Sequence, residues 1–292
     1  MTISIRTFLR SSRGLRATLA VALAAALAPL AAQADPVRLG GTGSALATMA
    51  QLAQAYRTLD PSFQLEVVPN LGSGGGLKAL AAGSVQLAVA SRALKPEEAA
   101  AGLRAVEYGR TPFLIATTKA GVTDLTRAQI ADLYAGRTSH WGDGQPVRLV
   151  LRPASDGDSA LLASLSPEIK SALATAMARE GMVTGMTDQD AVDAIERLPG
   201  GLGTASLALL QSERRRAHPV SIDGIAPTPA NVLAGRYPYV KQLYVVTRVG
   251  APASVAGFVA FIGSEAGRRV LADTGHAVAP AGTVTASAAP QR

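Results

Sequence analysis

The stretch Asn70-Leu71-Gly72-Ser73-Gly74-Gly75-Gly76-Leu77-Lys78 places four glycines and a serine between two segments of different periodicity. Residues 63–68 have the pattern of a strand, and a helical pattern begins at Leu77. A glycine-rich turn at the start of a helix leaves backbone N–H groups unpaired, and with the helix dipole these groups attract an anion. The hydroxyl of Ser73 can donate or accept a further hydrogen bond. The stretch therefore predicts a strand, an anion-binding turn and a helix, with a plain turn as the alternative.

The same arrangement of strand, small polar loop and helix occurs three more times. Gly43 and Ser44 follow a predicted strand over 37–41, and Ser91 follows one over 85–90. A loop from Arg152 to Ser159 follows a predicted strand over 147–151. Strands that alternate with helices predict an α/β fold with mainly parallel sheets. Because ligands in open α/β sheets bind at the carboxyl ends of the strands, we expect the four loops to form one site.

The first 34 residues have the pattern of a secretory signal peptide. Four arginines precede an Ala-rich apolar run, and Ala32-Gln33-Ala34 is a small-x-small cleavage pattern. A membrane anchor is the alternative, but the apolar run is shorter than the ~20 residues that a spanning helix needs. Because of this signal peptide we expect a periplasmic protein. All charges of the segment are arginine, so the formal net charge falls from +7 to +3 in the remaining 258 residues.

Composition argues against several classes of function. With aromatic residues at 4% and a small residual charge, we expect no nucleic-acid partner. The chain has no cysteine, so disulfides, a thiolate nucleophile and a lipid-modified cysteine are excluded. His140 and His218 lack companions at metal-ligand spacing, so we expect neither a metal nor another cofactor. The run Arg214-Arg215-Arg216 is interpreted as a solvated basic turn, with an interaction patch as the alternative.

The order of motifs resembles that of the periplasmic phosphate-binding proteins of ABC transporters, within the type II solute-binding superfamily. The resemblance extends over nearly the whole chain after the signal peptide. The segments that carry it are Gly41-Thr42-Gly43-Ser44, Gly72 to Lys78, Val89 to Leu94, Leu133 to Arg137, Trp141-Gly142-Asp143, the Arg152 loop, Pro199 to Gly203, Tyr237-Pro238 and Phe258 to Ser264.

The resemblance implies two α/β lobes, each a mainly parallel sheet flanked by helices. Two hinge crossovers, near residues 116–119 and 237–244, would join them. Lobe one would comprise residues 35–117 and 240–292, and lobe two residues 118–239. By the same resemblance the ligand-binding residues are Gly43, Ser44, Ser73, Gly74, Ser91, Arg152, Asp158 and Ser159.

The function that the resemblance implies is capture of a tetrahedral oxyanion, inorganic phosphate first of all, for a membrane permease. Such a protein is a monomer and not an enzyme. Backbone N–H groups, hydroxyls and one arginine suit an oxyanion, because they supply many donors at short range. Another ligand, or a sensor in place of the permease as partner, remains an alternative.

Two positions depart from the pattern of that family. Arg92 stands where many members carry an aspartate that accepts a proton from phosphate, and the fourth loop reads Asp156-Gly157-Asp158 in place of Ser-Gly-Thr. A carboxylate beside an anion is unfavourable unless the anion brings a proton to share. The hypothesis is that Asp158, or failing that Asp156, replaces the missing acceptor and favours phosphate over sulfate. The alternative is that Asp158 caps a helix from Ala160.

A rival interpretation is a serine esterase. Residues 157–161, Gly-Asp-Ser-Ala-Leu, resemble the nucleophile block of GDS-type esterases, and Asp273 and His276 fit their Asp-x-x-His block. A triad is defined by geometry and not by order, so the structure can test it.

Overall fold

The computed structural model describes residues 35–278. The predicted signal peptide and the residues from Ala279 lie outside this range. Within it, no helix has both the length and the apolar character that crossing a membrane requires.

The N-terminal part repeats a strand–helix unit. The chain runs through β1 (Val37–Gly41), α2 (Gly43–Tyr56), β2 (Leu65–Val68), α3 (Gly72–Ala81) and β3 (Leu87–Ala90). Strand β1 pairs in parallel with both β2 and β3. The carboxyl ends of these strands therefore meet at one edge of the sheet, where α2 and α3 begin.

Helix α3 begins at Gly72, five residues before the predicted start at Leu77, so the glycine run is the beginning of the helix and not a loop. Packing explains why glycine is required inside it. A Cβ on Gly76 would lie 2.6 Å from Cα of Gly41, and a Cβ on Gly41 would lie 1.9 Å from the carbonyl oxygen of Val89. The glycines thus allow α3, β1 and β3 to approach closely.

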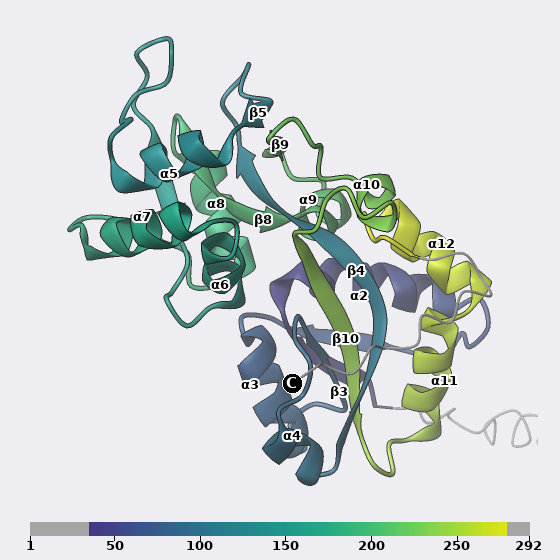
Figure 1. Ribbon diagram of the computed structural model, residues 1–292. Coiled ribbons are helices and arrows are strands. Elements are labelled where there is room, and N and C mark those ends of the chain that lie inside the picture. Colours follow the sequence, from purple (N-terminus) through teal and green to yellow (C-terminus); the bar gives the residue numbers. More distant parts are fainter. Residues whose placement is uncertain (1–34, 279–292) are drawn as a thin grey trace, which may run out of the picture. The chain divides into compact units, whose positions relative to one another are not determined.

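Two long antiparallel strands form the middle of the sheet. After α4 (Pro96–Ala100), β4 (Leu103–Thr117) pairs with β10 (Val240–Arg248), which lies between β3 and β4 (Figure 1). From Phe113 onward β4 pairs with β8 and β9. The sequence alone predicts this strand only over the apolar run 113–118, so the first ten residues of β4 lie outside that prediction.

Between β4 and β10 the chain again alternates strands with helices. Strand β8 pairs in parallel with β6, which pairs in parallel with β7. The elements of this part are β5 (Asp124–Leu125), α5 (Arg127–Ala135), β6 (Arg148–Leu151), α6 (Gly157–Ala163), α7 (Pro167–Ala178), β7 (Val183–Thr184), α8 (Asp188–Arg197), β8 (Gly201–Ser206), α9 (Leu207–Ser212), β9 (His218–Ile222) and α10 (Pro229–Leu233).

Helices cover both faces of each half of the sheet. Along β4, Phe113 and Ile115 pack against α5 and α7, whereas Leu114 and Ala116 pack against α8 and α9. In the N-terminal half, α2 packs on one face and α3 on the other. The predicted α/β class is thus confirmed, with parallel pairs on either side of the antiparallel β10–β4 pair.

The C-terminal part packs beside α2 in the N-terminal core. The amphipathic pattern over 254–274 predicts one helix, but the structure forms two, α11 (Ala253–Ile262) and α12 (Glu265–Asp273). Ser264 separates them, because its hydroxyl caps α12 by accepting from the N–H of Gly267 at 3.1 Å.

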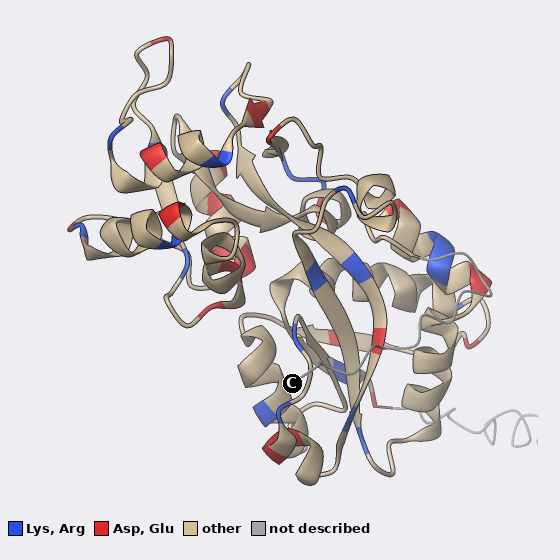
Figure 2. Cartoon of the chain, in the orientation of Figure 1, with Lys and Arg blue, Asp and Glu red and all other residues tan. Residues whose placement is uncertain are grey.

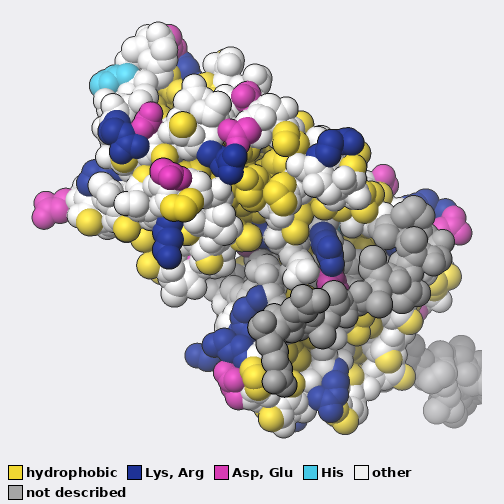
Figure 3. Space-filling view, in the orientation of Figure 1, with side chains coloured by type: hydrophobic (Ala, Val, Ile, Leu, Met, Phe, Trp, Pro, Cys, Tyr) yellow, Lys and Arg dark blue, Asp and Glu magenta, His cyan; other side chains and the backbone are white. Residues whose placement is uncertain are grey.

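Charged side chains are distributed over the fold. On the face shown in Figure 3, Lys and Arg are scattered among Asp and Glu. In the predicted basic turn, Arg215 forms ion pairs with Asp193, Glu196 and Glu213. These pairs join the turn to α8 and to the end of α9, so Arg215 has a structural role.

Candidate functional site

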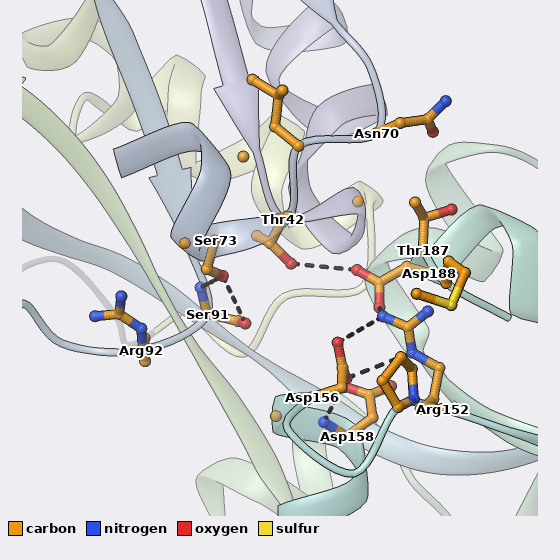
Figure 4. Close-up of a pocket in the computed structure, with 18 of the residues that line it drawn as sticks. Thr42, Asn70, Ser73, Ser91, Arg92, Arg152, Asp156, Asp158, Thr187 and Asp188 are labelled. Carbon is orange, nitrogen blue, oxygen red and sulfur yellow. Dashed lines mark hydrogen bonds and ion pairs between the residues drawn. The ribbon is translucent and has the colours of Figure 1, made fainter. Parts of the chain in front are cut away.

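The four predicted loops meet around one cavity of about 480 Å³ at the carboxyl ends of the strands. Figure 4 shows the seryl side chains on one side of it and a cluster of aspartates around Arg152 on the other. Residues that line the cavity are 41–43, 70–74, 91–92, 152–153, 155–158, 186–189 and Lys241.

Arg152 lies at the end of β6 and is buried, with 6% of its surface exposed. Its Nη2 and Nε atoms donate to the carboxylate of Asp156 at 2.7 and 3.4 Å, and its Nη1 donates to the carbonyl of Gly185 at 2.7 Å. Asp156 also caps α6, because it accepts from the N–H of Asp158 at 2.9 Å. The predicted alternative, in which Asp158 caps a helix from Ala160, is therefore wrong by two residues.

Asp158 forms a buried ion pair with Lys241 of β10. The hydroxyl of Thr204 donates to the same carboxylate at 3.4 Å. Burial raises the pKa of Asp158, and the ammonium group of Lys241 opposes that rise. The pKa of Lys241 is itself raised, because Asp158 and Asp188 outweigh the effect of burial, and the lysine is therefore charged. Figure 2 shows Lys or Arg positions, in blue, on the two long strands β4 and β10.

Asp188, the first residue of α8, contacts both the start of α2 and the two buried cations. Its Oδ2 accepts from the N–H of Ser44 at 2.8 Å and from the hydroxyls of Ser44 and Thr42 at 3.2 Å each. Its Oδ1 lies 3.4 Å from Nζ of Lys241 and 3.5 Å from Nη2 of Arg152. Burial alone would raise the pKa of Asp188, but Lys241 and Arg152 lower it to about 2. Asp188 is therefore a carboxylate at neutral pH.

The opposite wall carries neutral donors. The hydroxyls of Ser73 and Ser91 are 3.2 Å apart, and the N–H of Ser91 donates to Oγ of Ser73 at 3.0 Å. The N–H groups in the first turn of α3, at Gly72, Ser73 and Gly74, have no partner within their own helix. A Cβ on Gly74 would meet no atom within 4 Å, because that position opens into the cavity.

Arg92 is one of the lining residues, but its guanidinium is bound to Glu98. Its Nη1 and Nη2 atoms donate to the two carboxylate oxygens of Glu98 at 2.8 and 2.7 Å. This hydrogen bonding lowers the pKa of Glu98 to about 2. Figure 4 shows the Arg92 side chain pointing away from Ser73, Ser91 and the aspartates.

Six of the eight predicted ligand residues line this cavity: Gly43, Ser73, Gly74, Ser91, Arg152 and Asp158. Ser44 lies next to the lining and binds Asp188. Ser159 is buried behind it, and its hydroxyl donates to the carbonyl of Arg152 at 3.2 Å. Sequence reasoning missed Thr42, Asp188 and Lys241. The only local signal for Lys241 was its position as a lysine in an apolar strand. Asp188 gave no signal, because acidic residues are common in the first turn of a helix.

The triad that the rival esterase interpretation requires is not formed. Ser159 donates to a backbone carbonyl, whereas Nδ1 of His276 lies 3.1 Å from the carbonyl of Leu271 and 3.2 Å from the hydroxyl of Thr274. His276 packs against Tyr108 of β4. Among residues 35–278, no three His, Asp or Glu side chains are placed to hold a metal ion.

Comparison with known proteins gives a consistent result. The model of a family described as the PBP superfamily domain matches residues 26–266. The phosphate-binding protein PstS of Bacillus subtilis is 25% identical over 232 residues, which cover 77% of this chain and 74% of that protein.

Two solved structures are also similar. A protein from Clostridium perfringens, described as a substrate-binding protein of a phosphate ABC transporter and solved with bound phosphate, has a TM-score of 0.68 and 25% identity. The match covers 83% of this chain and 98% of that one. An ABC-type phosphate transport receptor from Vibrio cholerae has a TM-score of 0.57 at 20% identity and covers 83% and 100% of the two chains. The second match supports the fold alone.

Proposed function

Because this chain belongs to the PBP superfamily, we propose that it is a solute-binding protein that captures inorganic phosphate for uptake by an ABC transporter. The observation that carries the proposal is the convergence of four polar segments, each following a strand, on one cavity beside a buried arginine. Helix N-termini, hydroxyls and a guanidinium are the donors that a tetrahedral oxyanion requires. The phosphate-binding relatives support phosphate as the first ligand to test.

The proposed contacts of the anion come from both walls of the cavity. Gly43, Ser73, Gly74 and Ser91 would donate from the N-terminal loops, and Arg152 from the opposite wall, with Asp158 as the acceptor of the phosphate proton. Ser44 would contribute its N–H and hydroxyl, which now bind Asp188. Ser159 would act from behind by holding the carbonyl of Arg152. Equal affinities for phosphate and sulfate would refute the role of Asp158 as a proton acceptor.

We further propose that residues 35–117 with 240–292, and residues 118–239, form two lobes that close on the anion. The segregation of the buried clusters supports this division, because α2 and α3 pack in clusters separate from those of α5, α7 and α8. Contacts that both lobes make with the same anion would favour the closed state. The protein would act as a periplasmic monomer without catalytic activity and would present the closed form to a membrane permease.

The test is calorimetric titration of the purified protein, unfolded and refolded first to remove any bound anion. Phosphate, sulfate, molybdate and tungstate are compared at two pH values. Arg152→Gln is expected to weaken phosphate binding by at least tenfold, since each hydrogen bond to a charged group is worth about 1.5–3 kcal/mol. Arg148→Gln, at an exposed position on the same strand, is the matched control and should bind as the wild type does. Absence of phosphate binding by the wild type would refute the proposal.

A further inference from the structure

The carboxylate of Asp188 already binds donors that the sequence analysis assigns to the anion. Asp188 accepts three hydrogen bonds from Ser44 and Thr42 and lies within 3.5 Å of Arg152 and Lys241. Ser44 and Arg152 are two of the ligand residues predicted from the sequence. An internal anion therefore uses donors that a bound phosphate would need.

The local structure of two helices indicates that this contact is specific. Ser44 lies in the first turn of α2, where backbone N–H groups lack helical partners, and Asp188 opens α8. Thr42 is the N-cap residue of α2, but its hydroxyl makes no capping bond within that helix and donates to Asp188 instead. The carboxylate thus serves as the cap of α2 from a distant segment, and it lies at the positive ends of two helix dipoles.

The balance of charges in the cavity also indicates that Asp188 competes with a bound phosphate. Its lining contains three carboxylates, and of its three cations Arg92 is neutralised by Glu98. Arg152 and Lys241 are thus left to balance Asp156, Asp158 and Asp188. A phosphate that entered with Asp188 in place would meet donors already in use and a carboxylate of like charge.

We propose that Asp188 is an internal anion that competes with phosphate for the N-terminus of α2 and for the two buried cations, and thereby sets the affinity of the site. The inference rests on the proposed function of phosphate capture. When the cavity holds no ligand, the carboxylate satisfies the donors. When phosphate binds, the carboxylate leaves Ser44 and the phosphate oxygens take its place.

The test compares Asp188→Asn with the wild type by titration with inorganic phosphate and with sulfate. The amide keeps the size and one acceptor of the carboxylate but not its charge, so it competes less well. We expect phosphate and sulfate each to bind at least tenfold more tightly. The empty variant should melt at a lower temperature than the empty wild type, and phosphate should raise its melting temperature by a larger amount. Asp190→Asn is the matched control, because Asp190 lies on the same helix, is exposed and does not line the cavity.

The outcomes separate the two ideas. Phosphate binding by the wild type, with unchanged or weaker binding by Asp188→Asn, would overturn the inference and leave the proposed function standing. Weaker binding of phosphate but not of sulfate would assign Asp188 to the ligand's proton instead. Absence of phosphate binding by both proteins would refute the proposed function, and the inference with it. If Asp188→Asn does not fold, Asp188→Ser, which also lacks the charge, takes its place with the same expected result.

Discussion

Replacement of Lys241 by methionine tests the buried ion cluster most directly. Lys241 is 3% exposed, pairs with Asp158, lies 3.4 Å from Asp188 and donates to the hydroxyl of Ser44 at 3.0 Å. At an effective dielectric constant of about 20, unit charges at the Lys241–Asp188 distance attract each other by about 5 kcal/mol. Desolvation of the ammonium offsets part of this, but its removal leaves the buried carboxylate of Asp158 without a cation and Asp188 with Arg152 alone. We expect Lys241→Met to lower the free energy of unfolding by about 3–5 kcal/mol at pH 7.

Urea denaturation, followed by the fluorescence of the single buried tryptophan, Trp141, measures this loss. Lys170→Met, at an exposed position on α7, removes the same charge and should cost less than about 0.5 kcal/mol. Asp158→Asn in the Lys241→Met background should recover at least about 1 kcal/mol, because it removes one unpaired carboxylate. A loss below about 1 kcal/mol for Lys241→Met, or strict additivity with Asp158→Asn, would refute the reasoning.

Other consequences can be measured separately. Glu98→Gln should free Arg92 and tighten phosphate binding about threefold, less at high salt, and an affinity that does not change in low salt would contradict this. Gly76→Ala should lower the free energy of unfolding, measured in urea, by about 1–3 kcal/mol, because its Cβ would collide with Gly41. Gly74→Ala should leave stability unchanged but weaken anion binding, because its Cβ would meet no protein atom. Burial lowers the pKa of His276 to about 4, below its ordinary value of 6.5, so the unfolded chain binds the extra proton between these values. Stability should therefore fall by roughly 3 kcal/mol as the pH drops from 6.5 to 4. In His276→Gln the free energy of unfolding should depend less on pH between 6.5 and 4. The same pH dependence as in the wild type would show that His276 is not the group responsible.

The parts of the fold that could be predicted from the sequence are those with local signals. The sequence from Asp188 to Arg197 by itself predicts a helix, and α8 has these bounds, because the segment is strongly amphipathic and Thr187 caps it. The start of α3 was missed, because glycine disfavours helix and the close packing of Gly76 against Gly41 of β1 has no signal in the local sequence. The first ten residues of β4 were missed for a similar reason. They include exposed charged residues without clean alternation, and they are extended because β10 pairs with them.

The same distinction holds for the site. Arg152 and the seryl loops follow strands within one stretch of sequence, so their place at the sheet edge could be predicted. The roles of Lys241 and Asp188 could not be predicted, because the local sequence of each residue gives no sign of a binding site. Their contacts are with residues that are distant in the sequence. The departure at Arg92 was noticed, but its explanation depends on Glu98 of α4, which turns the guanidinium out of the cavity.

The position of β10 has a consequence for the order in which the molecule can form. This strand is the last one within residues 35–278, yet it lies in the middle of the sheet, bonded to β3 on one side and to β4 on the other. The hydrogen bond from Lys241 to Ser44 joins residues 197 positions apart. Contacts of such long range form slowly, because loop closure must precede them. A chain delivered from its N-terminus, by a ribosome or through a membrane pore, therefore has neither a closed sheet nor a complete cavity until nearly all of it has emerged. Recovery of anion binding during refolding would then mark the completion of the fold.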